Sequence, residues 1–259
     1  MDVINSPVGD RLIYGNGTTK RDWQQWSGLQ SLQTLVPEQA FPAGQRILII
    51  APHPDDEILG CAGLIQQLST LKREILLVAV TNGTQSHPDS QLYTPQQLDQ
   101  LRPQESLNAL KVLGVQNRVN RIALQLTDGE VTAEQQKLYA ALKELVRPDD
   151  ILVCTFAKDG HPDHEATGQT VQRLADQQQL SCYQVLIWSW HWARPQDNRI
   201  PWKSACKLEL TAAQLRLKKQ AIQCFKSQLE TDPSTGQAPI LSSHTVERIL
   251  MPCEVYIHV

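Results

Sequence analysis

Residues 46–65 read RILIIAPHPDDEILGCAGLI. The first six residues predict a buried strand, and the apolar residues from Ile58 onwards predict a helix. A histidine and three consecutive acids stand between them, within residues 53–57. In open α/β folds, ligands bind at the carboxyl ends of the strands. This segment therefore predicts both an α/β fold and the position of its site.

A second polar cluster, HPDHE at residues 161–165, follows the apolar run ILVCTF at residues 151–156. Two strand ends that each carry a histidine-centred cluster predict one metal site assembled from both. Either cluster alone could instead be a helix N-cap, because Asp is favoured there and acids suit the first turn. Their joint occurrence favours the metal site.

Apolar runs and amphipathic segments alternate along the chain from residue 46 onwards. This alternation predicts a Rossmann-like α/β fold, a mostly parallel sheet flanked by helices on both faces. The glycine-rich fingerprints GxGxxG and GxxxxGK[ST] are absent, so we expect no standard nucleotide loop. We predict strands at residues 46–51, 74–81, 121–126, 151–156, 183–190, 205–210 and 254–259, and helices at residues 58–71, 95–113, 133–146, 164–179 and 212–228.

The chain shows no internal repeat and no linker-like composition after residue 43. We therefore predict a single domain over residues 44–259. Residues 1–43 are predicted to form a helical N-terminal extension, in which residues 21–35 carry Trp and Leu at three-residue intervals. We expect this segment to pack on the domain. A contact in a homo-oligomer is the alternative.

The composition is that of an ordinary globular protein, with 20% charged residues and a net charge of -3. No basic tract is present, so we expect no nucleic-acid partner. No apolar run reaches the ~18 residues that a membrane span needs. The start lacks a signal-peptide pattern, and the six cysteines include no CxxC pair, so we expect reduced thiols in a cytoplasmic protein.

The first cluster offers metal ligands and a base. His53 and Asp56 are three residues apart at a loop-to-helix transition, so both side chains can face one point. Asp55 points elsewhere locally, and a carboxylate there could take a proton from metal-bound water. Glu57 falls in the first helical turn, where it suits the helix dipole and can support the site from behind.

The second cluster can complete the site. One of His161 and His164 would be a ligand, and the other would stabilise an oxyanion or protonate a leaving amine. Asp159 and Asp163 are candidates to orient the imidazoles, because metal-site histidines usually donate their second ring N–H to a carboxylate or carbonyl. A catalytic zinc typically has three protein ligands and one open position.

At these residues the chain resembles the PIG-L/LmbE-like deacetylases, which act on N-acetylglucosaminyl-phosphatidylinositol and related N-acetylglucosamine compounds. The resemblance rests on residues 51–57 (APHPDDE) and 160–164 (GHPDH). Supporting matches are Thr81-Asn82-Gly83, Arg102 with Glu105, Leu113-Gly114, Asp128-Gly129, and the region from Lys219 to Gln228. It spans residues 46–230.

The resemblance implies a zinc-dependent amidohydrolase. By position, His53, Asp56 and His164 would hold Zn²⁺. Asp55 would be the general base, and His161 would stabilise the oxyanion or act as the acid. The products would be acetate and a free amine, usually on an amino sugar.

Arg102 would help to bind the polar or phosphorylated part of the substrate, as the resemblance implies. Pro103 follows it directly and disfavours helical conformation before it, so we expect Arg102 near a helix start. A surface ion pair with a nearby acid is the alternative for Arg102.

Other substrate contacts are predicted from aromatic residues and one late histidine. Trp188, Trp190 and Trp192 alternate, which would place them on one face of the strand predicted at 183–190. With Trp202 they could form an aromatic wall for a sugar ring, and ordinary core packing is the alternative. His244 lies in a late loop from which it could reach the site.

These observations favour metal-dependent hydrolysis of an N-acyl amide on a small, N-acylated sugar-like molecule. A metal-dependent phosphoesterase is a second hypothesis, although two-metal versions usually need more carboxylates. A sugar-binding module with a structural metal is a third, but structural zinc is normally closed by four protein ligands. Ligands of this type also accept other divalent ions.

Overall fold

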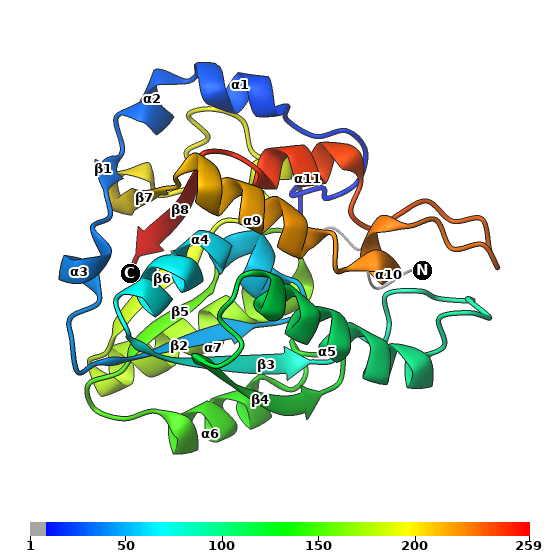
Figure 1. Cartoon of the computed structure of the whole chain (residues 1–259), viewed down its shortest axis with the longest axis horizontal. Helices are drawn as coiled ribbons and strands as arrows, with labels where there is room; N and C mark the ends of the chain where they lie inside the picture. The colour runs from blue at the N-terminus through cyan, green and yellow to red at the C-terminus, as the bar shows by residue number, and fades with distance from the viewer. Residues whose placement is uncertain (1–8) are drawn as a thin grey trace.

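The structure is a computed structural model, and it describes residues 9–259 (Figure 1). Residues 1–8 lie outside the described residues. The beginning of the predicted extension and the residues read for a signal-peptide pattern fall in that segment.

A twisted sheet forms the centre of the described chain, with eight strands in the order β1-β7-β8-β6-β5-β2-β3-β4 (Figure 1). Neighbouring strands are parallel except at β8, which runs antiparallel to β6 and to β7. The predicted mostly parallel sheet is confirmed. The strands are β1 Gln33–Thr34, β2 Arg46–Ala51, β3 Glu74–Thr81, β4 Val119–Leu126, β5 Ile151–Thr155, β6 Ser181–Val185, β7 Ala205–Glu209 and β8 Cys253–His258.

Helices cover both faces of the sheet, as predicted. Alternate residues of β2 explain this, because Ile47 and Ile49 join one hydrophobic core while Leu48 and Ile50 join another. The first core includes residues of α4 Asp56–Thr70, α5 Pro95–Val112 and α9 Ala212–Ile222. The second includes residues of α6 Gln135–Leu145 and α7 Pro162–Gln178.

Several predicted bounds are wrong where a helix is interrupted. The predicted helix at 212–228 ends at Ile222, and the one at 21–35 breaks at Trp26, whose backbone is extended. Pro103 lies inside α5, so the prediction that Arg102 stands near a helix start is wrong. The shorter helices are α1 Lys20–Gln25, α2 Ser27–Gln30, α3 Pro37–Ala40, α8 Ser189–Trp192, the 3-10 turn Trp202–Ser204, α10 Lys226–Leu229 and α11 Ser243–Ile249.

The predicted strand at 183–190 is also wrong in its second half, because β6 ends at Val185. The backbone N–H groups of Ile187, Trp188 and Ser189 donate to the carboxylate of Asp159 instead of continuing a ladder. The chain then turns into α8. The three alternating tryptophans therefore do not share one face of a strand.

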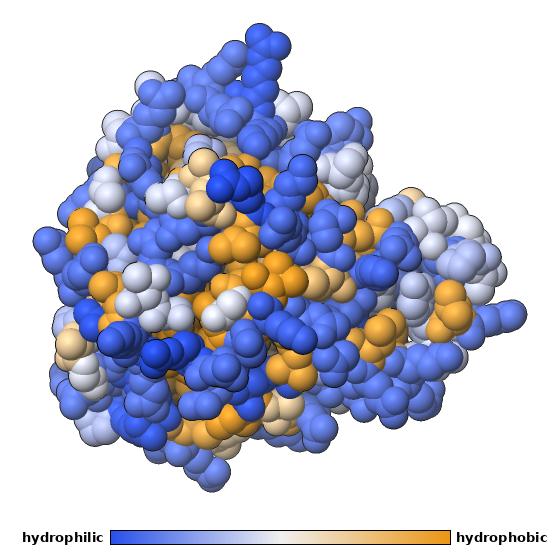
Figure 2. All heavy atoms as spheres, viewed as in Figure 1, coloured by the Kyte–Doolittle hydropathy of each residue, from blue (hydrophilic) through white to orange (hydrophobic). Residues whose placement is uncertain are grey.

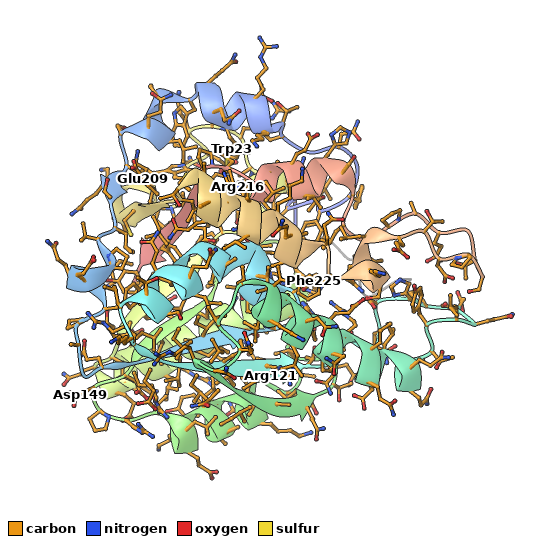
Figure 3. The ribbon with its side chains drawn as sticks, in the orientation of Figure 1. Trp23, Arg121, Asp149, Glu209, Arg216 and Phe225 are labelled. Carbon is orange, nitrogen blue, oxygen red and sulfur yellow. The ribbon has the colours of Figure 1, made fainter. Side chains whose placement is uncertain are left out.

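Four of the six tryptophans pack together in an aromatic cluster that joins α1 to the segment after β6. Trp190 is buried against the ring of Trp23, with centroids 5.0 Å apart, and Trp23 Nε1 donates to the Trp190 carbonyl. Trp26 and Trp202 extend the cluster, with centroids 4.7 Å apart. Figure 3 labels Trp23 where α1 faces the rest of the domain. Core packing is therefore the role of these aromatic rings.

The face of the molecule in Figure 2 is mostly hydrophilic, with apolar atoms in separate groups. Exposed large apolar side chains in the described chain include Leu101, Leu107 and Val112 of α5. Within residues 9–259, no helix combines the length and apolarity that crossing a membrane requires.

Gly168 allows α7 to lie close to the end of β5. A Cβ at this position would come 2.5 Å from the Thr155 carbonyl oxygen and 2.8 Å from Ala157 Cα. Both are backbone atoms, so neither can move aside cheaply. We expect Gly168→Ala to lower the free energy of unfolding by about 1–3 kcal/mol, measured by urea denaturation. Asp176→Ala, at an exposed position of the same helix, should change it by less than about 0.5 kcal/mol. Equal effects would contradict the close packing.

Candidate metal centre and active site

The first cluster turns sharply between β2 and α4. Thr81 on the adjacent β3 fixes the turn, because its N–H and its hydroxyl both donate to the Pro52 carbonyl. Asp55 is the N-cap of α4, with φ 155° and ψ -29°, a conformation that residues with a side chain rarely adopt. Glu57 supports this turn by accepting hydrogen bonds from the Asp55 N–H and the Ser106 hydroxyl.

One carboxylate oxygen lies between two imidazoles. Asp56 Oδ2 is 3.2 Å from His53 Nδ1 and 3.2 Å from His164 Nε2. Ligands at about 2.0–2.1 Å from a tetrahedral zinc are about 3.3 Å from one another, so this spacing fits a shared metal. All three side chains are buried. The structure therefore brings the three predicted ligands together.

Buried carboxylates stand behind both imidazoles. His164 Nδ1 lies 2.8 Å from Asp159 Oδ2, and His53 Nε2 lies 3.2 Å from both Asp163 Oδ2 and Asp128 Oδ1. Such partners fix the orientation of metal-site histidines and raise their basicity. The sequence reasoning named Asp159 and Asp163 but missed Asp128. The Asp128-Gly129 pair that follows a predicted strand was the available signal.

The same carboxylates are held by backbone groups. Asp163 accepts from the N–H groups of Gly129 and Val131, and Asp128 accepts from that of Gln85. His53, Asp128 and Asp163 are close enough to hold an ion themselves. The oxygens of Asp128 and Asp163 accept backbone hydrogen bonds and face one imidazole, whereas Asp56 Oδ2 accepts from the His53 backbone N–H and lies between two imidazoles.

His161 lies beside these ligands, with its ring centroid 4.7 Å from that of His53. Its ring nitrogen also lies within 4.8 Å of those of His53 and His164, so it could complete a three-histidine group. However, His161 Nδ1 caps α7 by accepting from the Asp163 N–H at 3.2 Å. Burial and the neighbouring histidines lower the pKa of His161 to about 3. The ring is therefore neutral at pH 7, and its Nε2 carries the proton.

Asp55 is a buried carboxyl whose protonation is finely balanced. Burial raises its pKa to about 7, although the positive charge of Arg102 opposes that rise. Arg102 Nη2 donates to Asp55 Oδ2 at 3.2 Å, and Nη1 donates to the Gly83 carbonyl at 3.0 Å. Arg102 is thus in a buried ion pair and lines the same cavity as Asp55.

The charges of the ligand cluster stabilise one another. Burial lowers the pKa of His164, but the charges and hydrogen bonds of Asp56 and Asp159 together raise it to about 9. Burial raises the pKa of Asp56, but His164 and His53 hold it well below its usual range. Without a metal, a proton on the imidazoles therefore takes the place of a cation between the carboxylates.

The chain matches the family model described as PIG-L: GlcNAc-PI de-N-acetylase over residues 48–175. Residues 48–175 therefore form a PIG-L family domain. The matched segment contains both histidine clusters and Asp128, which are the residues that build the centre.

Curated relatives match part of their own length. The chain is 25% identical over 147 residues to the diacetylchitobiose deacetylase of Thermococcus kodakarensis, covering 56% of this chain and 54% of that protein. It is 30% identical over 135 residues to a probable N-acetyl-alpha-D-glucosaminyl L-malate deacetylase of Bacillus subtilis, covering 50% of this chain and 60% of that protein. The chain thus spans a little over half the length of these relatives.

Solved structures share the PIG-L fold. The zinc-inhibited form of a teicoplanin deacetylase superposes with a TM-score of 0.61 and 16% identity. The match covers 83% of this chain and 97% of that one. At this identity the likeness establishes the architecture alone.

The centre opens into a cavity of ≈ 400 Å³. His53, Asp55, Asp56, Arg102, His161 and His164 line it. Two predicted substrate residues lie elsewhere, because Trp190 is in the aromatic core and His244 is exposed on α11. Of the three alternating tryptophans, Trp188 lines the cavity.

The backbone of Asp55 predicts an unusual response to substitution. Asp55→Gly and Asp55→Ala both remove the carboxylate, but only glycine relieves the strained φ. We expect the glycine variant to be the more stable by about 1–3 kcal/mol in free energy of unfolding.

Thr211, the N-cap of α9, supplies the control because its φ is -65°. At an ordinary N-cap, a glycine variant is normally more stable than an alanine variant by up to about 1 kcal/mol in free energy of unfolding. A difference at Asp55 no larger than that at Thr211 would show that the Asp55 backbone is not strained.

Proposed function

We propose that this protein hydrolyses an N-acyl amide, an acetyl group in the first instance, on an amino sugar or sugar conjugate. The observation that carries the proposal is Asp56 between two imidazoles that are each backed by a buried carboxylate. An ionisable Asp55 and a neutral His161 stand in the same cavity. The deacetylase names of the relatives support the substrate class.

We propose that His53, Asp56 and His164 hold a divalent cation, Zn²⁺ in the first instance. Two imidazole nitrogens and one carboxylate oxygen are a donor set that suits zinc and accepts other divalent ions. When bound, the cation would supply Lewis-acid polarisation of the amide carbonyl and a lower pKa for water in the site.

Asp55 is proposed as the general base. Its carboxylate would take the proton of the attacking water as the oxygen bonds to the amide carbon. Arg102 holds this carboxylate in the cavity and keeps part of its population ionised near neutral pH. The same proton would then pass from Asp55 to the amide nitrogen as the carbon–nitrogen bond breaks, which leaves the Asp55 carboxylate, a carboxylic acid that keeps the second proton of the water, and a free amine. The acid then loses that proton to solvent at neutral pH.

His161 is proposed to stabilise the oxyanion. Because its Nδ1 accepts a backbone hydrogen bond, the neutral ring presents Nε2–H as a donor. A preoriented donor in a buried site stabilises negative charge that develops on the carbonyl oxygen. With a pKa of about 3, His161 is poorly suited to carry a second proton for the leaving amine.

Metal content and acetate release test the proposal together. With zinc, wild type should release acetate from N-acetylglucosamine, diacetylchitobiose or N-acetylglucosaminyl malate. Asp55→Asn should keep the metal and lower kcat by at least about 100-fold. His164→Ala should lose both metal and activity, whereas the exposed His244→Ala should keep both. Phosphate release from phosphate esters without acetate release, or full activity in Asp55→Asn, would sink the proposal.

The pH profile tests the link between Arg102 and Asp55. Arg102 lowers the pKa of Asp55, so Arg102→Met should raise it. Because the base must be unprotonated, kcat/KM should fall off at a higher pH on the acid side than in wild type. Arg102→Lys keeps the charge and should move this limb less. An unchanged limb with only a higher KM would show that Arg102 acts on substrate alone.

A further inference from the structure

An N-terminal strap, residues 11–18, runs over the cavity and lies before the PIG-L match at 48–175. One anchor is at its start, where Arg11 Nε and Nη2 each donate to the Glu165 carboxylate at 2.9 Å. Glu165 follows the proposed ligand His164 directly on α7. The first anchor is therefore attached to the element that positions the centre.

The second anchor is Arg248 of α11, a fully buried side chain. Its Nη1 donates to the carbonyls of Asn16 and Thr18 at 2.7 and 3.1 Å. Its Nη2 donates to His191 Nδ1, so His191 carries its proton on Nε2 and donates to the Tyr14 carbonyl at 3.0 Å. The end of the strap is thus held at three backbone carbonyls.

Between the two anchors, Ile13, Tyr14 and Gly15 line the cavity. Ile13 is buried, and a Cβ at Gly160 would lie 3.2 Å from its Cγ2. Gly160 directly precedes His161, the proposed oxyanion donor, and Ile13 and His161 line the same cavity. The strap therefore contributes part of the wall next to the reacting groups.

Two further apolar side chains line the cavity from other elements. The N–H of Leu59 donates to the Asp55 carbonyl at 2.8 Å, so Leu59 lies one turn beyond the proposed base. The N–H of Trp188 donates to Asp159, the carboxylate behind His164, at 2.9 Å. Apolar surface from the strap, α4 and the segment before α8 thus borders the centre.

We propose that Ile13 and Tyr14, with Leu59 and Trp188, form a subsite for an apolar substituent of the substrate. The inference rests on the proposed function and specifies its substrate class: an amino sugar that carries an apolar group. That group is either an acyl chain longer than acetyl or an apolar group on the sugar. Tyr14 is 54% exposed, which leaves its ring free to contact a ligand.

Ligand binding to the full chain after chelator treatment tests the subsite without hydrolysis. Calorimetry would compare N-acetylglucosamine with N-hexanoylglucosamine, and the methyl with the hexyl glycoside of N-acetylglucosamine. Burying a methylene improves affinity up to about fourfold, so we expect at least a tenfold gain for one six-carbon ligand. A gain for the N-hexanoyl compound identifies an acyl subsite, and a gain for the hexyl glycoside identifies the other end of the sugar. No gain in either pair would overturn the proposal.

Variants of the strap test whether a gain in affinity for a six-carbon ligand comes from the proposed subsite. Tyr14→Ala and Ile13→Ala should each remove most of the gain, which is the ratio of the two affinities within a ligand pair. Tyr14 is exposed, so its variant should fold normally. Leu12→Ala is the matched control, because Leu12 is an exposed apolar residue of the strap that does not line this cavity. A gain that survives in both cavity variants would overturn the proposal.

Acetate release from zinc-loaded wild type separates the two proposals. Activity on N-acetylglucosamine, with no gain in affinity for the longer ligands, would contradict the subsite proposal and support the hydrolase proposal. A gain in affinity that depends on the strap, with no acyl release from any compound, would contradict the hydrolase proposal and support a site that binds such ligands.

Discussion

The placement of one buried carboxylate governs the architecture around the centre. Asp56 faces an imidazole from its own turn and another from a cluster more than a hundred residues away. A buried charge is costly unless it is paired and hydrogen-bonded. The pairing is available because β2 and β5 are adjacent parallel strands, so their carboxyl ends meet at one edge of the sheet. The sheet order is thus what makes the charge cluster tolerable.

The carboxylates around Asp56 also hold the neighbouring backbone and imidazoles in fixed positions. Asp159 alone accepts from the backbone of three successive residues, from a serine hydroxyl and from His164. The His164 imidazole is bonded to a carboxylate that cannot move without giving up several hydrogen bonds of the segment that follows β6. The orientation of this imidazole and the course of the chain are therefore determined together.

The sequence predicted the central strands well because their signal is local. The bounds of 46–51 and 74–81 were predicted without error, since strands buried on both faces read as continuous apolar runs. The end of β6 was predicted wrongly because a distant acid, Asp159, withdraws the N–H groups that would continue the ladder. No periodicity in residues 183–190 reveals that interaction.

Site residues were likewise predicted where the signal is local in the sequence and missed where it depends on distant contacts. Five of the residues predicted in the two clusters line one cavity, and their spacing and their place after strands are visible in the sequence: His53, Asp55, Asp56, His161 and His164. Their chemical roles remain proposals. Asp128 was missed because a single Asp-Gly pair resembles an ordinary turn. Trp190 was predicted at the site, but it packs on Trp23, which lies 167 residues earlier in the N-terminal extension.

The place of β8 gives the fold an order of assembly. β1 pairs with β7, and β7 is joined to the rest of the sheet only through β8, which follows every other strand in the chain. During synthesis from the N-terminus, the strands that carry the two histidine clusters can pair before β8 emerges. The early segment with β1 must wait for the last strand, which makes its contacts among the most distant in sequence. Removing Cys253–His258 would thus separate β1 and β7 from the rest of the sheet.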